Sequence, residues 1–226
     1  MKKTKITALL LCVTLILSGC ASMNNTTKGG LLGGGGGAAL GAVVGGLIGK
    51  GKGAAIGAGI GAAVGAGAGV LIGKKMDKAA AEAAAIEGAQ VEQVTDNNGL
   101  QAVKVTFDSG ILFDLNSSTL KAAARTSLTE FSAILKSNTD MDVAIFGHTD
   151  KSGTLEVNQR VSKQRAESVQ NFLKGLGVAA DQLVTVEGKD YQEYDDSKSA
   201  AENRRVEIYL YASKEMIEAA NNGTLQ

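Results

Sequence analysis

The chain has 226 residues, of which 23 are basic and 23 acidic, with one histidine, two cysteines and neither proline nor tryptophan. The balanced charge falls to about −3 once the three lysines of the N-terminal segment are removed with it, so no basic excess points to nucleic-acid binding. A metal site of three or four side-chain ligands is also disfavoured, because only one histidine and no free thiol are available.

Residues 1–19 have the three parts of an export signal: a basic start, a short apolar core and small residues before Cys20. The ending Leu17-Ser18-Gly19-Cys20 resembles a bacterial lipobox, which implies that the Cys20 thiol receives a diacylglycerol and becomes the new N-terminus. An ordinary secretory signal with a chance cysteine is the alternative. Because Cys12 is removed with the signal, the exported chain has no disulfide and must fold on its own core. We expect residues 20–28 to form a lipidated N-terminal linker.

Residues 29–73 carry glycine at every fourth position among alanine, valine, leucine and isoleucine. In water so much glycine opposes a helix, but in lipid the unsolvated backbone favours one. Small residues every fourth position also let two helices approach closely. We therefore expect a glycine-zipper hairpin of two membrane helices, separated by Lys50-Gly51-Lys52. A flexible glycine-rich spacer is the alternative.

The alanine-rich, charged segment 74–88 predicts a solvated helix or stalk. The composition of residues 89–226 is typical of a globular domain. Alternating apolar residues predict strands at 90–95 and 100–107, joined by a turn at Asp96-Asn97-Asn98-Gly99. Helical spacing predicts helices at 117–135, started by Ser117 or Ser118, and at 155–176, and further strands are expected at 142–147, 182–188 and 204–211. This order predicts one α+β domain.

The only histidine stands in His148-Thr149-Asp150, directly after the strand predicted at 142–147. A nucleophilic triad needs an activated serine or cysteine, and the sequence contains no G-x-S-x-G motif. Arg165 follows fifteen residues after Asp150, on a predicted helix and at the rim of its apolar face. Spacing alone leaves two interpretations open. The two residues form a structural ion pair, or Arg165 holds the carboxylate and Asp150 the ammonium of a bound amino acid.

Four separated motifs resemble, in order and spacing, those of the OmpA C-terminal, peptidoglycan-binding family. They are FDLNSSTL (113–120), FGHTDKSG (146–153), NQRVSKQRAESVQNFL (158–173) and ENRRVEI (202–208). The resemblance covers about residues 105 to 212. It implies the OmpA C-terminal-like α+β fold, a mixed sheet with helices packed on one face. It also implies non-covalent binding of the peptidoglycan stem peptide through its diaminopimelate, without a cofactor.

The same resemblance implies which residues form the binding site. Asp150 and Arg165 fall on the pair that clamps diaminopimelate. The other expected site residues are Phe113, Asp114, Thr149, Asn158 and Arg205. His148 corresponds to a histidine that shapes the turn and catalyses nothing. Two departures affect the expected cleft: Val157 stands where the family often has an aromatic residue, and the loop Gly188-Lys189-Asp190-Tyr191 replaces a Gly-x-Gly-Glu loop.

Together these parts predict a tether, with lipid on Cys20 and the glycine helices in a membrane and the C-terminal domain on the cell wall. Ala21 takes the place of the aspartate that retains enterobacterial lipoproteins in the inner membrane, so the outer membrane, facing the periplasm, is favoured. One alternative is an oligomeric pore or assembly factor built by the glycine helices. Another is a wall amidase, for which the sequence shows neither an activated nucleophile nor a metal-ligand set.

Overall fold

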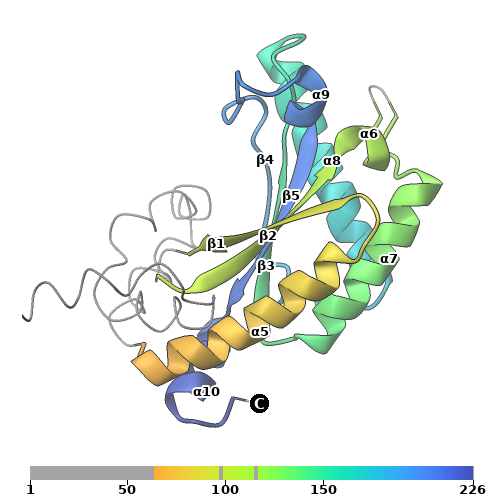
Figure 1. Cartoon of the computed structure of the whole chain (residues 1–226). Helices are drawn as coiled ribbons and strands as arrows, with labels where there is room; N and C mark the ends of the chain where they lie inside the picture. The colour runs from red at the N-terminus through yellow and green to blue at the C-terminus, as the bar shows by residue number, and fades with distance from the viewer. Residues whose placement is uncertain (1–63, 97–98, 115–116, 226) are drawn as a thin grey trace, which may run out of the picture.

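The computed structural model describes residues 64–96, 99–114 and 117–225 (Figure 1). Within these residues the strands form one sheet in the order β1-β2-β5-β3-β4. The strands are β1 (Ala89–Thr95), β2 (Gln101–Asp108), β3 (Met141–Gly147), β4 (Thr185–Gly188) and β5 (Arg205–Ala212). β3 and β4 are parallel, and the other neighbouring strands are antiparallel. The predicted α+β class with a mixed sheet is confirmed.

The long helices cover one face of this sheet, as predicted (Figure 1). The helices are α5 (Ala66–Ala84), α6 (Ser109–Leu112), α7 (Ala122–Ser137), α8 (Leu155–Gly175), α9 (Ala200–Asn203) and α10 (Lys214–Asn221). α5 packs on β1 and β2, α8 packs on β3 and β4, and α7 contacts both of these helices. The short helices α6 and α9 lie together at one end of the sheet (Figure 1).

Strand alternation divides the side chains between a helix-covered face and an open face of the sheet. On β5, Val206, Ile208 and Leu210 enter the main core beneath the helices. Tyr209 lies on the other face, where its ring meets that of Phe146 edge-on at 5.7 Å between centroids. Because successive side chains of a strand point to opposite faces, neighbouring residues of β5 serve different parts of the molecule.

Two glycines allow α8 to lie unusually close to the end of the sheet. A Cβ atom at Gly147 would stand 2.1 Å from the backbone oxygen of Ser162, and one at Gly188 would stand 2.4 Å from the nitrogen of Lys163. No side chain fits in these gaps, so glycine is required at both strand ends. The contact fixes α8 one helical turn before Arg165 and thereby positions that arginine.

The expected solvated stalk at 74–88 is corrected by the structure. Residues up to Ala84 belong to α5, whose Ile72, Met76 and Ala83 are fully buried in the main core. Lys75 also forms a 2.6 Å ion pair with Asp140, which lies just before β3. The buried positions recur at helical spacing, and small alanines let the helix approach the sheet closely. The folded unit therefore begins before residue 89, the boundary expected from the sequence.

Most of the predicted glycine-zipper hairpin lies outside the described residues, as does Cys20. The last part of the segment 29–73, from Ala66, forms the first turns of α5, and α5 as a whole packs against β1, β2 and α10. Among the described helices, none has the length and apolar character needed to cross a membrane.

The first hairpin agrees with the prediction, whereas the start of the next helix does not. β1 and β2 pair from Ala89 with Phe107 to Thr95 with Gln101, and Gly99 adopts the positive φ of 74° that the turn needs. Helix α7 begins at Ala122, later than the predicted start at 117, and its N-cap is Lys121 without a side-chain bond. The segment before it is held instead by an isolated bridge between Phe113 and Leu120.

Candidate functional site

Asp150 lies in the turn between β3 and α8 and is 7% exposed. Its carboxylate accepts hydrogen bonds from the backbone N–H and the hydroxyl of Ser152, and it forms an ion pair with Arg204. Burial acts to raise the pKa of Asp150, but the bonds from Ser152 and Arg204 outweigh it and hold the pKa below its ordinary value. The carboxylate is therefore ionised and oriented at neutral pH.

Arg165 projects from α8 towards the segment that follows α6, and it is 4% exposed. Its Nε donates to the carbonyl of Ser117 at 3.1 Å, and its two terminal nitrogens reach the hydroxyl of Ser109 at 3.4 Å and the carbonyl of Asp114 at 3.5 Å. The guanidinium also stands over the ring of Phe113, 5.2 Å from its centroid. These oxygens are neutral, so among the described residues no carboxylate pairs with this cation.

The structure brings together a carboxylate and two guanidiniums. Burial lowers the pKa of Arg165; the charge of Arg204 lowers it further, and the charge of Asp150 raises it. Asp150 and Arg165 therefore interact through space, although the direct ion pair considered from the sequence is formed by Arg204 instead. One negative and two positive charges leave this group with a net charge of +1, which suits a ligand carboxylate.

The other expected residues of this site have distinct places. Phe113 and Asp114 lie beside Arg165, with the Asp114 carboxylate exposed and 3.8 Å from the ammonium of Lys121. Asn158, on the first turns of α8, donates from its amide to the carbonyl of Ser152 at 2.8 Å and so fixes the turn around Asp150. Thr149 is buried, and its hydroxyl has no hydrogen-bond partner.

The expectation that Arg205 completes the basic side of the site is corrected: Arg204 takes that place. The Nε of Arg205 donates to Glu207 at 2.7 Å on the open face of the sheet, away from Asp150. The Asn-Arg-Arg motif contains both arginines, and strand alternation predicts that they face opposite ways. The sequence motif does not say which arginine meets Asp150, because β5 begins between them, at Arg205.

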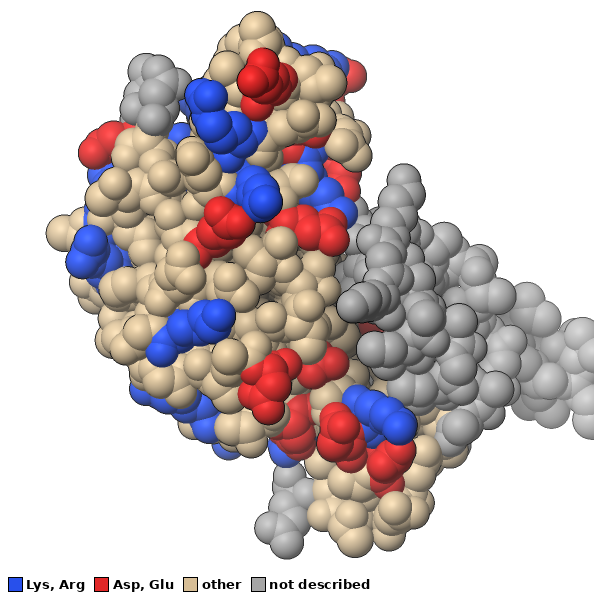
Figure 2. Space-filling view, turned by 180° about the vertical axis from the view of Figure 1, so that it is seen from behind, with Lys and Arg blue, Asp and Glu red and all other residues tan. Residues whose placement is uncertain are grey.

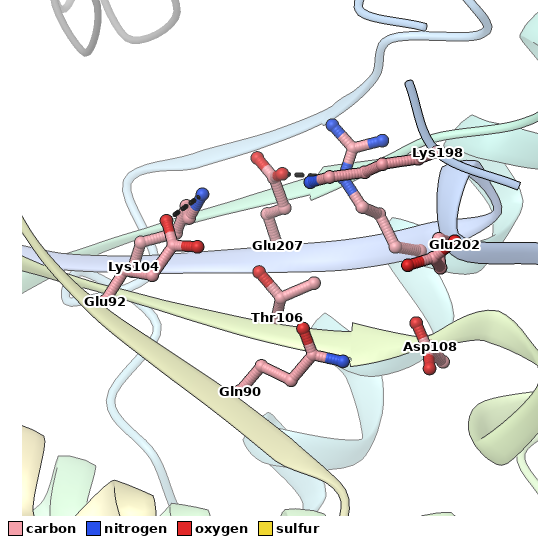
Figure 3. Close-up of a pocket in the computed structure, with 9 residues that line it drawn as sticks. Gln90, Glu92, Lys104, Thr106, Asp108, Lys198, Glu202 and Glu207 are labelled. Atoms are coloured by element: carbon pink, nitrogen blue, oxygen red, sulfur yellow. Dashed lines mark hydrogen bonds and ion pairs between the residues drawn. The ribbon is translucent and has the colours of Figure 1, made fainter. Parts of the chain in front are cut away.

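The open face of the sheet carries a polar groove lined by residues of β1, β2 and β5, together with Lys198 and Glu202 at α9 (Figure 3). Two ion pairs lie within the groove. Glu92 pairs with Lys104 at 2.5 Å, and Glu207 pairs with Arg205. Seen from behind, the described surface likewise mixes lysines and arginines with aspartates and glutamates (Figure 2). With four acidic and three basic residues in its lining, the groove lacks the excess of positive charge found around Asp150.

One group of residues in the described part of the chain has the composition of a metal site: His148, Glu193 and Glu207, whose ligand atoms lie within 4.8 Å of one another. Arg205 and the hydroxyl of Tyr209 already bind the Glu207 carboxylate, at 2.7 and 2.8 Å. A metal ion would have to displace these donors from Glu207, so the arrangement disfavours a metal site.

The comparisons with known proteins agree with this architecture. The OmpA family model matches residues 112–207, and a YMGG-like Gly-zipper model matches residues 1–77. The Probable lipoprotein YiaD of Escherichia coli is 32% identical over 126 residues, which cover 54% of this chain and 55% of that protein. The Peptidoglycan-associated lipoprotein of Pseudomonas aeruginosa is 34% identical over 131 residues, which cover 57% of this chain and 72% of that protein. The chain therefore belongs to the OmpA family.

Solved structures show the same fold at low sequence identity. The cell wall anchor of the T6SS from Pseudomonas aeruginosa matches 61% of this chain and 97% of its own, with a TM-score of 0.50 and 23% identity. A MotB-like protein from Desulfovibrio vulgaris matches 63% of this chain and 94% of its own, with a TM-score of 0.51 and 22% identity. The aligned region spans only about half of the YiaD relative.

Proposed function

We propose that this chain binds peptidoglycan non-covalently through the diaminopimelate of the stem peptide. The observation that carries the proposal is the meeting of an ionised Asp150 with the guanidiniums of Arg165 and Arg204 at one end of the sheet. Diaminopimelate offers carboxylate and ammonium groups, which are complementary to such a group of charges. The relative from Pseudomonas aeruginosa is named for its association with peptidoglycan, which supports the same ligand class.

The geometry suggests how the ligand enters. The Arg204 side chain is 35% exposed, whereas that of Asp150 is 9% exposed, so the ligand meets Arg204 first. When the ligand ammonium takes the place of Arg204 on Asp150, Arg204 becomes free to pair with a ligand carboxylate. Arg165 exchanges its long bonds to neutral oxygens for charge-assisted bonds to a carboxylate, and these are the stronger kind.

Sedimentation of the full chain with purified cell-wall sacculi tests this assignment. Asp150→Ala and Arg165→Ala are each expected to lower retention by about tenfold or more, because each removes a charged hydrogen-bonding partner of the ligand. Their circular dichroism should match the wild type. Arg160→Ala, an exposed arginine on the same helix, is the matched control and should bind normally. Wild-type retention in both site variants would remove the assignment.

We further propose that the other end of the chain is held in the outer membrane by lipid on Cys20, so that the protein tethers that membrane to the wall. The lipobox and the match to a lipoprotein support this anchor, and the glycine-zipper match supports an added membrane segment. Cys20→Ala should release the protein from the outer-membrane fraction if the lipid is the main anchor. Unchanged fractionation would instead favour the glycine segment, as the pore or assembly alternative requires.

A further inference from the structure

Asp190 lies in the loop after β4 and has an unusual backbone conformation. Its φ is 42°, and within the described part of the chain it is the one residue other than glycine with a positive φ. In the loop that was expected to read Gly-x-Gly-Glu, Asp190 stands at the position of the second glycine. Glycine adopts this left-handed conformation more easily than a residue with a Cβ atom. The backbone therefore does not favour aspartate here.

The carboxylate of Asp190 is buried, yet one of its oxygens is unsatisfied. Asp190 is 1% exposed, and its Oδ1 has no hydrogen-bond partner among the described residues. Its Oδ2 accepts a hydrogen bond from the side-chain amide of Gln192 at 3.0 Å. Burial of an acceptor without a partner destabilises a folded protein, because the acceptor loses its hydrogen bond to water. A ligand that donates to Oδ1 would restore that hydrogen bond.

Backbone contacts place this aspartate beside the Asp150 turn. The N–H of Thr149, the residue before Asp150, donates to the carbonyl of Asp190 at 2.8 Å. The N–H of Asp190 donates at 3.2 Å to the hydroxyl of Ser162, which lies on α8 three residues before Arg165. The Thr149 hydroxyl is also buried and, in the described structure, has no hydrogen-bond partner. Two unsatisfied oxygens thus belong to two hydrogen-bonded residues at the candidate site.

An ammonium group held at Asp150 needs more acceptors than that carboxylate offers, because an ammonium has three N–H donors. The Oδ1 of Asp150 already accepts from the N–H and the hydroxyl of Ser152. Only its Oδ2 becomes available when Arg204 leaves it. The Thr149 hydroxyl and the Oδ1 of Asp190 are acceptors of the right number for the two remaining N–H groups.

We propose that Asp190 is a further ligand-binding residue, which together with Thr149 completes the set of acceptors for the ligand ammonium held by Asp150. This inference rests on the proposed function. The approach to Asp190 lies at Gln192, an exposed residue that donates to the Oδ2 of this carboxylate. Gln192 thus stands at Asp190 as Arg204 stands at Asp150: a donor nearer the surface on a buried carboxylate.

The experiment measures affinity and stability of the full chain in parallel. Diaminopimelate is titrated calorimetrically into the wild type and Asp190→Gly, and both proteins are unfolded in urea. Asp190→Gly removes the unsatisfied oxygen and relieves the backbone, so its urea midpoint should rise by about 0.5 M. Its Kd for diaminopimelate should nevertheless rise about tenfold, because a charge-assisted hydrogen bond to the ligand is lost. A purely structural aspartate would not separate the two quantities in this way.

A matched variant and a matched ligand distinguish a direct contact from a general effect. Asp196→Asn removes an exposed carboxylate of the same loop, which pairs with Lys151 at 2.7 Å, and should change the Kd by less than about twofold. Pimelate has the same carbon chain and both carboxylates of diaminopimelate but no ammonium. Its affinity should therefore not fall in Asp190→Gly.

Three results would overturn the inference: an unchanged Kd for diaminopimelate in Asp190→Gly, a lower urea midpoint in that variant, or an equal loss of affinity for diaminopimelate and pimelate. The proposed function fails separately, if the wild type binds no diaminopimelate or if Asp150→Ala binds it as the wild type does. Loss of binding in Asp150→Ala with normal binding in Asp190→Gly would leave the proposed function standing and remove Asp190 from the site.

Discussion

Two groups of charged residues lie close together in this protein and differ in their net charge. Asp150, Arg165 and Arg204 carry an excess positive charge at one end of the sheet. On the open face, Arg205 forms an ion pair with Glu207 at 2.7 Å, so the charge of this arginine is balanced. The adjacent residues Arg204, which follows α9, and Arg205, which begins β5, thus have different roles. The group with excess positive charge is suited to binding a ligand, and the group whose charges are paired is suited to a structural role.

The largest expected effect comes from a change that disturbs both groups. Gly147→Ala would place a Cβ atom 2.1 Å from the backbone oxygen of Ser162, so α8 must move off the sheet. We expect the free energy of unfolding to fall by about 3 kcal/mol, measured by urea denaturation. Gly175→Ala, on the same helix, meets no atom within 4 Å and should change stability by less than about 1 kcal/mol. Equal stability of the two variants would contradict the close packing.

Two substitutions, one in each group, distinguish a role in ligand binding from a role in stability. Arg205→Met leaves the buried Glu207 without its guanidinium, and should lower the free energy of unfolding by about 2 kcal/mol while ligand retention is kept. Arg204→Met removes a partly exposed ion pair, and should cost less than about 1 kcal/mol while retention falls about tenfold. Urea denaturation gives the free energy of unfolding of each variant, and sedimentation with sacculi gives its retention. Lost retention in Arg205→Met with normal retention in Arg204→Met would assign the ligand site to the open face.

The smallest expected effect is on the pH dependence of stability, and it comes from a carboxylate that lacks the ion pair formed by Glu207. Burial, aided by Glu215 and Asp181, raises the pKa of Asp142 from 3.8 to about 6. The folded chain thus holds this proton more tightly than the unfolded chain, so its stabilising effect is full below pH 3.8 and is lost as the pH rises through about 6.

Because Asp142 is partly exposed, solvent screening reduces this loss to about 1 kcal/mol. Asp142→Asn should remove that part of the decline in unfolding free energy between about pH 4 and pH 7. Glu82→Gln, which changes an exposed ion pair with Lys78 on α5, should leave the decline as it is. An identical decline in Asp142→Asn and the wild type would contradict the assignment.

The sequence predicted the sheet better than the segment before it. The hairpin and the strands at β3 and β5 follow from alternation and turn residues, which are local signals. α5 was missed as part of the fold because its buried stripe consists largely of alanines, with Ile72 and Met76 as its large members. In sequence, an alanine-rich buried face differs little in hydrophobicity from a solvated helix, so only the tertiary packing shows that the helix is buried.

The site was predictable as far as motifs place residues on elements. Asp150, Arg165, Phe113 and Asp114 do lie together: Asp150 lies in the turn after β3, Arg165 lies on α8, and Phe113 and Asp114 follow α6. The choice of Arg204 over Arg205 depends on where β5 begins, to within one residue, and element ends are poorly marked in a sequence. Glu193 carried no signal at all, because its contact with His148 joins a loop to a distant strand end.

The central claim is that Asp150 and its two neighbouring arginines bind an amino acid carrying both charges. Calorimetric titration of diaminopimelate into the full chain at neutral pH tests it most directly. The account predicts one binding site in the wild type, its loss in Asp150→Asn and its retention in Arg205→Met. Equal binding by the wild type and Asp150→Asn, or no binding by the wild type, would contradict it.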